Sequence, residues 1–262
     1  MKTVETFINQ SSCQEVANAL FENAIDSMKH ALEHYKKLDK TKENLKYIII
    51  HVGHSAELLL KSMLAEYDAK LLIDKRSRYD RTIDYRYTIK LLQDEGLLIV
   101  EDTDRQRLEQ LREFRNRIEH FIFDISVPQA QQIVDGVISH WFWLLRESMD
   151  RDIHDYLDHS EVELVLNADQ AYRRHVVVAH EEIENQKGSS EKDAVYINTC
   201  VCEDCLEETV LIDAYDGKAR CHYCGSQFFV EECVRCGTPI LLSDRSDDPI
   251  RCTSCWQDIE RE

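Results

Sequence analysis

Eight of the ten cysteines in this chain form four pairs, and two residues separate the partners of each pair. The pairs are Cys202 and Cys205, Cys221 and Cys224, Cys233 and Cys236, and Cys252 and Cys255. Two intervening residues let one tight turn present both thiolates to a tetrahedral ion, and two such turns supply four ligands at about 2.3 Å. Because four thiolates close the coordination shell, such an ion stabilises a fold and does not act on a substrate. The spacing therefore predicts two structural Zn2+ ions.

The pairs belong to a tandem repeat, since a shift of 31 positions carries the first two pairs onto the last two. The same shift superposes Asp213 on Asp244 and Arg220 on Arg251. Each copy resembles the zinc-ribbon family, and the resemblance covers residues 200–262. The segments between the pairs suit short hairpin strands.

The four-ligand sets have two possible arrangements, one within each copy and one crossed between the copies. Cys200 and His222 are further potential donors, which we interpret as bystanders. A disulfide framework fits less well, because nine cysteines lie between Cys200 and Cys255 while Cys13 stands alone before them. The N-terminus lacks the basic and apolar regions of a signal peptide, and no run approaches about 18 apolar residues. We therefore expect a cytoplasmic protein that does not associate with a membrane.

The net charge argues against a general binder of polyanions. The chain has 32 basic and 50 acidic side chains, a formal charge of −18. Residues 200–262 carry 6 basic and 14 acidic side chains, a formal −8. Two ions, each held by four thiolates, make this −12. Any nucleic-acid site must therefore be a local basic patch outside the tail.

A second group of residues with possible chemistry lies in the segment LREFRNRIEHF, where Arg115 and Asn116 precede His120. Cleaving RNA without a metal needs a base for the 2′-hydroxyl and a cation for the charge that develops on phosphate. His120 titrates near neutral pH and can transfer the proton, while the planar guanidinium of Arg115 can hold phosphate oxygens. Asn116 can orient the phosphate or the imidazole, and Glu119 can set the imidazole tautomer.

This segment resembles the motif of the HEPN superfamily, in which an Arg and a polar residue precede a His that follows the Arg by four to six positions. The resemblance covers roughly residues 1–160, and HVGHSAELLLKSMLAE also looks like the second helix of such domains. It implies a helical bundle and a metal-independent ribonuclease or toxin that leaves a 2′,3′-cyclic phosphate. It also implies a homodimer whose two motifs line one cleft, with RNA as the substrate and no cofactor for catalysis.

A local basic patch precedes this motif in residues 75–90, where Tyr79, Tyr85 and Tyr87 alternate with cations. Alternating cations and aromatic rings suit single-stranded RNA, through phosphate attraction and base stacking. The residues that we predict to contact RNA are Lys75, Arg76, Arg78, Arg81 and Arg86.

The remaining histidines are weaker candidates for a catalytic or metal-binding site. Arg173 and Arg174 with His180 match the loose Arg–His spacing, but their segment carries a β-branched run instead of a helix end. Two further sets fall at helical spacing, and neither contains the HExxH pattern of a helical zinc site. We interpret both as packing or surface residues. They are His30 and His34 in one helix, and His51, His54 and Glu57 in the next.

Apolar periodicity and capping residues predict the elements that position these groups. Helices are expected over residues 14–38, from Thr41 to 68, from Thr82 to Asp94 with an end at Gly96, from Thr103 to 123, and from Pro128 to 157. Residues 161–183 mix strand and helix features, and the pattern does not choose between them. The predicted fold is mainly α, with a HEPN-like helical domain (1–183), a linker (184–199) and a small β-rich domain of tandem zinc ribbons (200–262).

Two functions of different classes follow. The leading hypothesis is a dimeric endoribonuclease of the HEPN type, a toxin or antiviral-defence effector that an antitoxin or other protein partner restrains. The alternative is a non-catalytic adaptor, in which an inactive bundle and an acidic zinc tail bind a protein partner. The charge of −18 favours the alternative, because a general nuclease should not repel its substrate.

Overall fold

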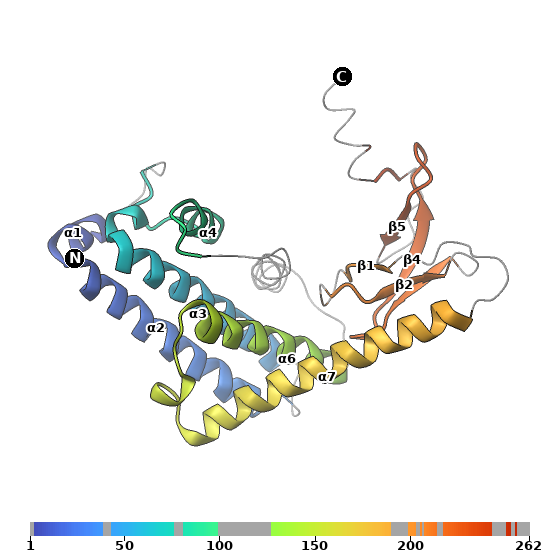
Figure 1. The fold of residues 1–262 in the computed structure, drawn as a ribbon, viewed down its shortest axis with the longest axis horizontal. Helices are drawn as coiled ribbons and strands as arrows, with labels where there is room; N and C mark the ends of the chain where they lie inside the picture. The colour runs from blue at the N-terminus through green and yellow to red at the C-terminus, as the bar shows by residue number, and fades with distance from the viewer. Residues whose placement is uncertain are drawn as a thin grey trace. The chain divides into compact units, whose positions relative to one another are not determined.

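The computed structural model describes residues 3–38, 43–75, 81–98, 127–189, 199–202, 205, 207–213, 217–242, 250–252 and 255. The chain divides into two compact units, Met1–Tyr172 and Arg173–Glu262. It is mainly helical with a strand-rich C-terminal region (Figure 1), as the sequence predicts at this level. The boundary between the units lies inside a helix and not at the predicted residue 183.

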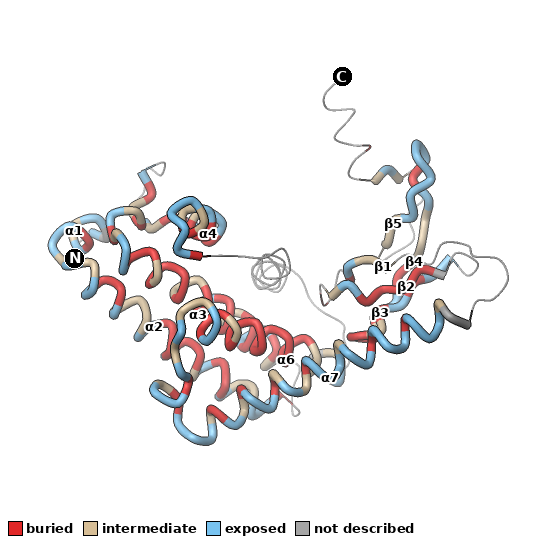
Figure 2. Tube along the Cα trace, viewed as in Figure 1, coloured by how far each residue is buried: buried red, intermediate tan, exposed pale blue. Residues whose placement is uncertain are grey.

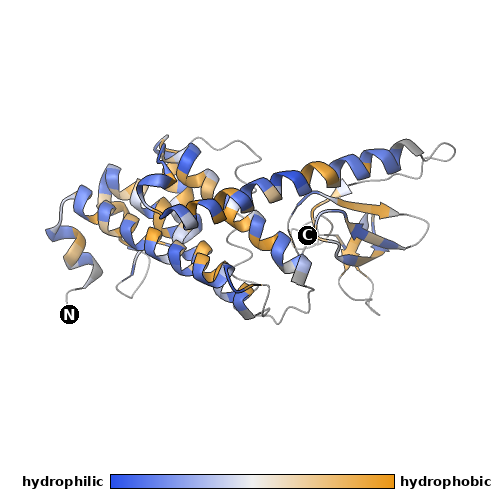
Figure 3. Cartoon of the chain, turned by 90° about the horizontal axis from the view of Figure 1, so that it is seen from below, coloured by the Kyte–Doolittle hydropathy of each residue, from blue (hydrophilic) through white to orange (hydrophobic). Residues whose placement is uncertain are grey.

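The centre of the first unit is a hairpin of two long helices, α2 (Cys13–Tyr35) and α3 (Glu43–Asp68), preceded by the short helix α1 (Val4–Gln10). Ser12 begins α2 with a capping box, in which the backbone N–H of Glu15 donates to the Ser12 Oγ and the Glu15 carboxylate accepts from the Ser12 N–H. The facing sides of both helices are buried (Figure 2). Apolar residues gather between the helices of this bundle, and hydrophilic residues cover its outer faces (Figure 3).

A third helix, α6 (Val127–Trp143), packs against α3 and completes this core. The indole N–H of Trp141, itself fully buried, donates to the Ser55 Oγ at 2.7 Å. The Ser55 hydroxyl in turn donates to the carbonyl of Ala24 on α2 at 2.6 Å. One chain of hydrogen bonds thus joins all three helices and satisfies two polar groups that burial would otherwise penalise.

A short helix, α4 (Tyr85–Asp94), follows a 3-10 turn at Ala69–Leu72. The predicted start at Thr82 is wrong, because the cap is Asp84, whose carboxylate accepts from the N–H of Tyr87 at 2.9 Å. Thr82 lies before the helix and pairs with Ile73 in a β-bridge. Gly96 ends α4 as predicted. Its φ is +68°, a backbone conformation that residues with a side chain rarely adopt.

The structure also corrects the expected course of the chain after α6. The helix predicted to reach residue 157 ends at Trp143 and continues only as a π-helical turn, Leu144–Ser148, before a 3-10 turn at Ile153–Asp155. The ambiguous segment 161–183 is part of one helix, α7 (His159–Ser189). This helix also includes residues 184–189, so the linker predicted from residue 184 does not begin there.

Among the described residues, one helix, Asn44–Leu72, is long and apolar enough to cross a membrane by length and composition alone. In its apolar 18-residue window, 67% is buried inside the protein, as in the core helix of a helical bundle.

The second unit contains one antiparallel sheet in the order β1-β2-β3-β4-β5. Its strands are β1 (Thr199–Cys200), β2 (Val210–Asp213), β3 (Lys218–Cys221), β4 (Gln227–Glu232) and β5 (Pro239–Leu242). The sequence repeat is visible here, because β1 pairs with β2 as β4 pairs with β5. β4 also pairs with β3, so the two copies share a single sheet.

A buried carboxyl lies between α2 and α6. The Tyr35 hydroxyl donates to the Asp135 Oδ1 at 2.7 Å, and the Gln131 amide donates to the same oxygen at 2.8 Å. Burial raises the pKa of Asp135 from 3.8 to about 6, against the opposing effect of these hydrogen bonds. The folded protein therefore holds this proton more tightly than the unfolded chain does.

This shift predicts a pH-dependent contribution to stability. Because the folded pKa is the higher one, the contribution is fully present below pH 3.8 and is lost as the pH rises through about 6, by about 3 kcal/mol. The side chain of Asp135→Asn cannot ionise. The free energy of unfolding of this variant should therefore rise relative to that of the wild type as the pH increases from 3.8 through about 6. Chemical denaturation across the window measures the difference. The exposed Asp94→Asn is the matched control, and equal pH profiles for wild type and Asp135→Asn would contradict the prediction.

Candidate functional sites

The structure gathers the eight paired cysteines into two groups of four, and either group can hold a metal ion. In each group the four sulfur atoms lie within 4.8 Å of one another. The groups are Cys202, Cys205, Cys221 and Cys224, and Cys233, Cys236, Cys252 and Cys255. The ligands of each group come from one copy of the repeat, which decides between the two arrangements that the sequence permits.

Tight turns position the sulfur atoms, and three of the four turns are described well enough to compare. In each, the N–H of the first cysteine donates to a carbonyl five residues later at 2.8 Å, from Cys202 to Glu207, Cys221 to Ser226, and Cys233 to Thr238. Gly225 and Gly237 follow the second cysteine of their pairs with φ of +79° and +70°. Glycine fits these positions because a Cβ disfavours that conformation. The repeated turn is the local reason that the spacing predicts a metal site.

The first group is enclosed, and two hydroxyls lie beside its sulfur atoms. All four of its cysteines are buried. The buried hydroxyls of Thr209 and Ser226 lie 3.2 Å and 3.1 Å from the sulfurs of Cys221 and Cys224. Hydrogen bonds from the neighbouring thiols, that of Cys202 foremost, lower the pKa of Cys221 far below its ordinary value. Burial raises the pKa of Cys205, and the pKa of Cys202 is raised as well, so the four sulfurs all become thiolates only when a cation lies among them.

The second group is more open. Cys233 and Cys255 are buried, but Cys236 is exposed and Cys252 is partly exposed. The backbone N–H of Cys252 lowers the pKa of Cys233 to about 6, which again favours a thiolate. The hydroxyl beside Cys236 belongs to the exposed Thr238, 3.1 Å away. An ion in this group is therefore more accessible to chelators and oxidants than an ion in the first.

The two additional donors, Cys200 and His222, lie outside both groups. Cys200 is on β1, and its sulfur is 4.0 Å from the carbonyl of Val210. The imidazole of His222 instead meets α7, with its Nδ1 2.9 Å from a carboxylate oxygen of Glu182. Next to it, Tyr223 makes an edge-to-face contact with the ring of His175. Sequence spacing could not reveal this packing, because it joins residues about 40 positions apart.

The predicted catalytic residues Arg115, Asn116, Glu119 and His120 lie outside the described residues, as do Arg76 and Arg78 of the predicted RNA contacts. Of the remaining contacts, Lys75 and Arg86 are exposed. Arg81 is also largely exposed, but its guanidinium pairs at 3.2 Å with the buried carboxylate of Asp74.

Tyr85 in the basic segment cannot stack on RNA bases as the sequence predicted. Tyr85 is buried in the helical core, 7% exposed, and cannot stack on a base. Tyr87 is only partly buried.

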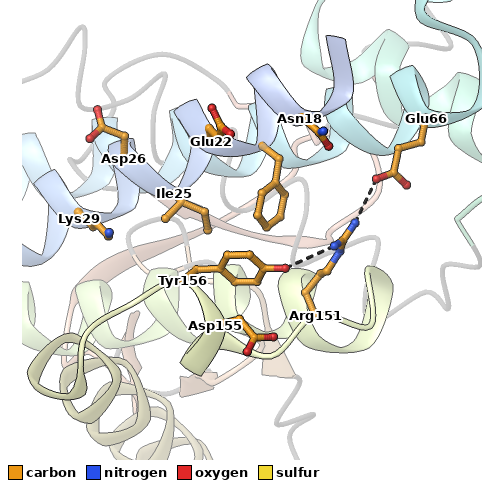
Figure 4. Close-up of a pocket in the computed structure, with 10 residues that line it drawn as sticks. Asn18, Glu22, Ile25, Asp26, Lys29, Glu66, Arg151, Asp155 and Tyr156 are labelled. Atoms are coloured by element: carbon orange, nitrogen blue, oxygen red, sulfur yellow. Dashed lines mark hydrogen bonds and ion pairs between the residues drawn. The ribbon is translucent and has the colours of Figure 1, made fainter. Parts of the chain in front are cut away.

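The first unit also has a surface pocket of about 510 Å³ (Figure 4). The guanidinium of Arg151 lies over the ring of Phe21 and pairs with the Glu66 carboxylate at 3.2 Å. The charged lining consists of Glu22, Asp26, Glu66 and Asp155 against Lys29 and Arg151. Because carboxylates outnumber cations, the pocket does not suit a phosphate group.

Comparison with known proteins gives no relative: no family model, curated protein or solved structure matches this chain.

The grouping of the cysteines predicts the metal content of variants. The wild-type protein should hold two ions per chain, and Cys221→Ser should hold one, because it loses a buried ligand of the first group only. Cys200→Ser should keep both ions, since Cys200 belongs to neither group. Elemental analysis of purified protein measures the ratio. A lost ion in Cys200→Ser, or two ions in Cys221→Ser, would overturn these ligand sets.

Proposed function

We propose that this chain is a metal-independent endoribonuclease of the HEPN type, whose helical unit cleaves RNA and whose two cysteine groups hold structural zinc. The observation that carries the proposal is the sequence Arg115-Asn116-x3-His120, which lies between α4 and α6 of a helical bundle. The bundle supports the proposal only at the level of fold class, and the motif supplies the chemistry.

Zinc fits both cysteine groups better than other ions do. Zn2+ favours four thiolates in tetrahedral geometry and needs no redox partner. The sheet of the second unit has strands of only two to six residues, so little apolar surface is available to stabilise it. Metal binding, on the order of 10 kcal/mol per site, then provides most of the folding free energy. Zinc in this unit acts on the fold and takes no part in the cleavage step.

The cleavage step needs a proton transfer from the 2′-hydroxyl, a proton transfer to the departing 5′-oxygen, and one centre of positive charge. In its neutral form His120 accepts the proton of the 2′-hydroxyl, and the resulting oxyanion attacks the adjacent phosphorus. Arg115 holds the phosphate oxygens as negative charge develops on them. Asn116 orients the phosphate or the imidazole, and Glu119 sets the tautomer of His120. As the bond between phosphorus and the 5′-oxygen breaks, the protonated imidazole or a water molecule returns a proton to the leaving oxygen. The products are a 2′,3′-cyclic phosphate and a free 5′-hydroxyl, formed in a cleft between two subunits.

The loop before α4 provides the local positive charge that an acidic protein needs for RNA. Lys75, in this loop, and Arg86, in the first turn of α4, are both exposed. Thr82, just before α4, is anchored by Lys61, whose buried ammonium donates to the Thr82 hydroxyl at 2.9 Å and pairs with Glu57 at 2.6 Å. A local basic patch can steer an RNA strand toward a cleft even when the net charge is repulsive. A toxin or antiviral effector in the cytoplasm, restrained by a protein partner, is the role that matches such an activity.

Removal of the general base tests the proposal. Purified protein should cleave mixed RNA in the presence of EDTA, and His120→Ala should lower the rate by about a hundredfold or more. His154→Ala, which changes an exposed histidine on the 3-10 turn at Ile153–Asp155, should cleave like the wild type. Mapping of the cut ends should find 2′,3′-cyclic phosphates. If wild type and His120→Ala cleave alike, or if neither cleaves, the assignment to His120 fails.

The second candidate is a non-catalytic adaptor, and the charge distribution favours it. The C-terminal copies carry 14 acids and 6 bases, a surface suited to a basic protein partner and not to RNA. Affinity capture of the intact protein from its host distinguishes the two functions. A stoichiometric protein partner together with no RNA cleavage supports the adaptor, whereas cleavage that depends on His120 excludes it.

A further inference from the structure

Histidines that the sequence places in two separate helical sets face one another across the α2–α3 hairpin. His30 and His34 lie one turn apart on α2, and His51 comes from α3. The ring centre of His51 is 5.7 Å from that of His30 and 6.1 Å from that of His34. The rings of His34 and His51 are nearly parallel, with 10° between their planes. Three imidazoles thus lie close together where α2 packs on α3, with His51 next to both of the others.

These separations are slightly larger than those of imidazoles that share a metal ion. An ion about 2 Å from each nitrogen places the centres of two ligating rings about 5 Å apart in tetrahedral geometry. Two histidines four residues apart on one helical face are also the arrangement that helical zinc sites use. The nitrogens of the three rings do not converge within 4.8 Å as the cysteine sulfurs do, so binding requires small side-chain rotations. His30, whose side chain is 53% exposed, has room for such a rotation.

His34 is already oriented to present one nitrogen. Its Nδ1 lies 3.0 Å from the Asn44 Oδ1, which can only accept, so Nδ1 carries the proton and Nε2 keeps its lone pair. The orientation of the Asn44 amide is fixed in turn, because its Nδ2 donates to the carbonyl of Lys37 at 2.9 Å. Tyr47 stacks on the His34 ring at 4.8 Å. A carbonyl oxygen that fixes the tautomer of a histidine is the usual support of a metal ligand.

The charge around the three rings favours a cation. Asp26 and Glu33 place carboxylate oxygens 3.6 Å and 3.8 Å from the ring nitrogens of His30.

We propose that His30, His34 and His51 form a binding site for a divalent transition-metal ion that favours imidazole ligands, such as Ni2+ or Zn2+. The site is separate from both cysteine groups and lies wholly in the helical unit. Because its ligands come from both arms of the hairpin, a bound ion clamps α2 to α3. It therefore stabilises the helical unit in proportion to occupancy.

Ni2+ binding to the intact protein tests this site. The cysteine groups are first loaded with zinc, and Ni2+ is then titrated by calorimetry near pH 7.5. One further equivalent should bind, and it should raise the melting temperature of the helical unit. His51→Gln and His30→Gln should each weaken binding by about tenfold or more, because each removes a direct ligand. His154→Gln, on the 3-10 turn outside the cluster, should bind as the wild type does.

The absorption spectrum identifies where the ion binds, because thiolate-bound Ni2+ has intense charge-transfer bands and imidazole-bound Ni2+ does not. Binding without these bands that is lost in both cluster variants supports the proposal. Unchanged binding in His30→Gln overturns it, and so does binding that shows thiolate bands or no binding at all. His30 is exposed, so His30→Gln is informative even if His51→Gln fails to fold.

Discussion

The repulsion between closely spaced thiolates is the constraint on which the whole C-terminal unit depends. Four sulfurs within 4.8 Å of one another cannot all carry charge unless a cation lies among them. The turn hydrogen bonds, the positive-φ glycines and the hydroxyls of Thr209 and Ser226 all serve to hold that charge in place. Short strands and a small apolar core would then suffice, because a metal ion bound among the sulfurs would provide the main stabilisation.

The stability of the helical unit has a different physical origin. Its three long helices enclose fully buried side chains such as Met28, Leu59 and Trp141, and burial of apolar surface provides its stability. Polar groups enter this core where they are satisfied, as in the chain from Trp141 through Ser55 to the carbonyl of Ala24. The proposed chemistry of cleavage and the proposed histidine site both belong to this unit, whereas the two groups of four cysteines belong to the other.

The features that the sequence predicts correctly are those that local geometry determines. Cysteine spacing specifies a turn, and the turn specifies a ligand pair, so all eight members of the two groups follow from spacing alone. The start of α4 is misplaced because Thr82 and Asp84 are both good caps, and tertiary pairing of Thr82 with Ile73 decides between them. The valine run at 176–178 hides the helical period of α7, although Ala179 and Ile183 continue its buried face.

Contacts between elements lie beyond sequence reasoning. His51 lies about 20 residues from its imidazole neighbours, and only the packing of α2 on α3 brings them together. Burial of Tyr85 and the pairing of Arg81 with Asp74 likewise depend on the tertiary fold, so a basic, tyrosine-rich segment does not reveal which of its residues are available.

The position of β4 in the sheet has a consequence for how the repeat can vary. This strand leaves the second turn of the first copy, pairs with β3, and also pairs with β5 of the second copy. Removal of the second copy, by proteolysis or by genetic deletion, would turn β4 from an inner strand into an edge strand, which can pair with other chains and promote aggregation. The pairing of β4 on both of its sides therefore couples the two copies in one sheet.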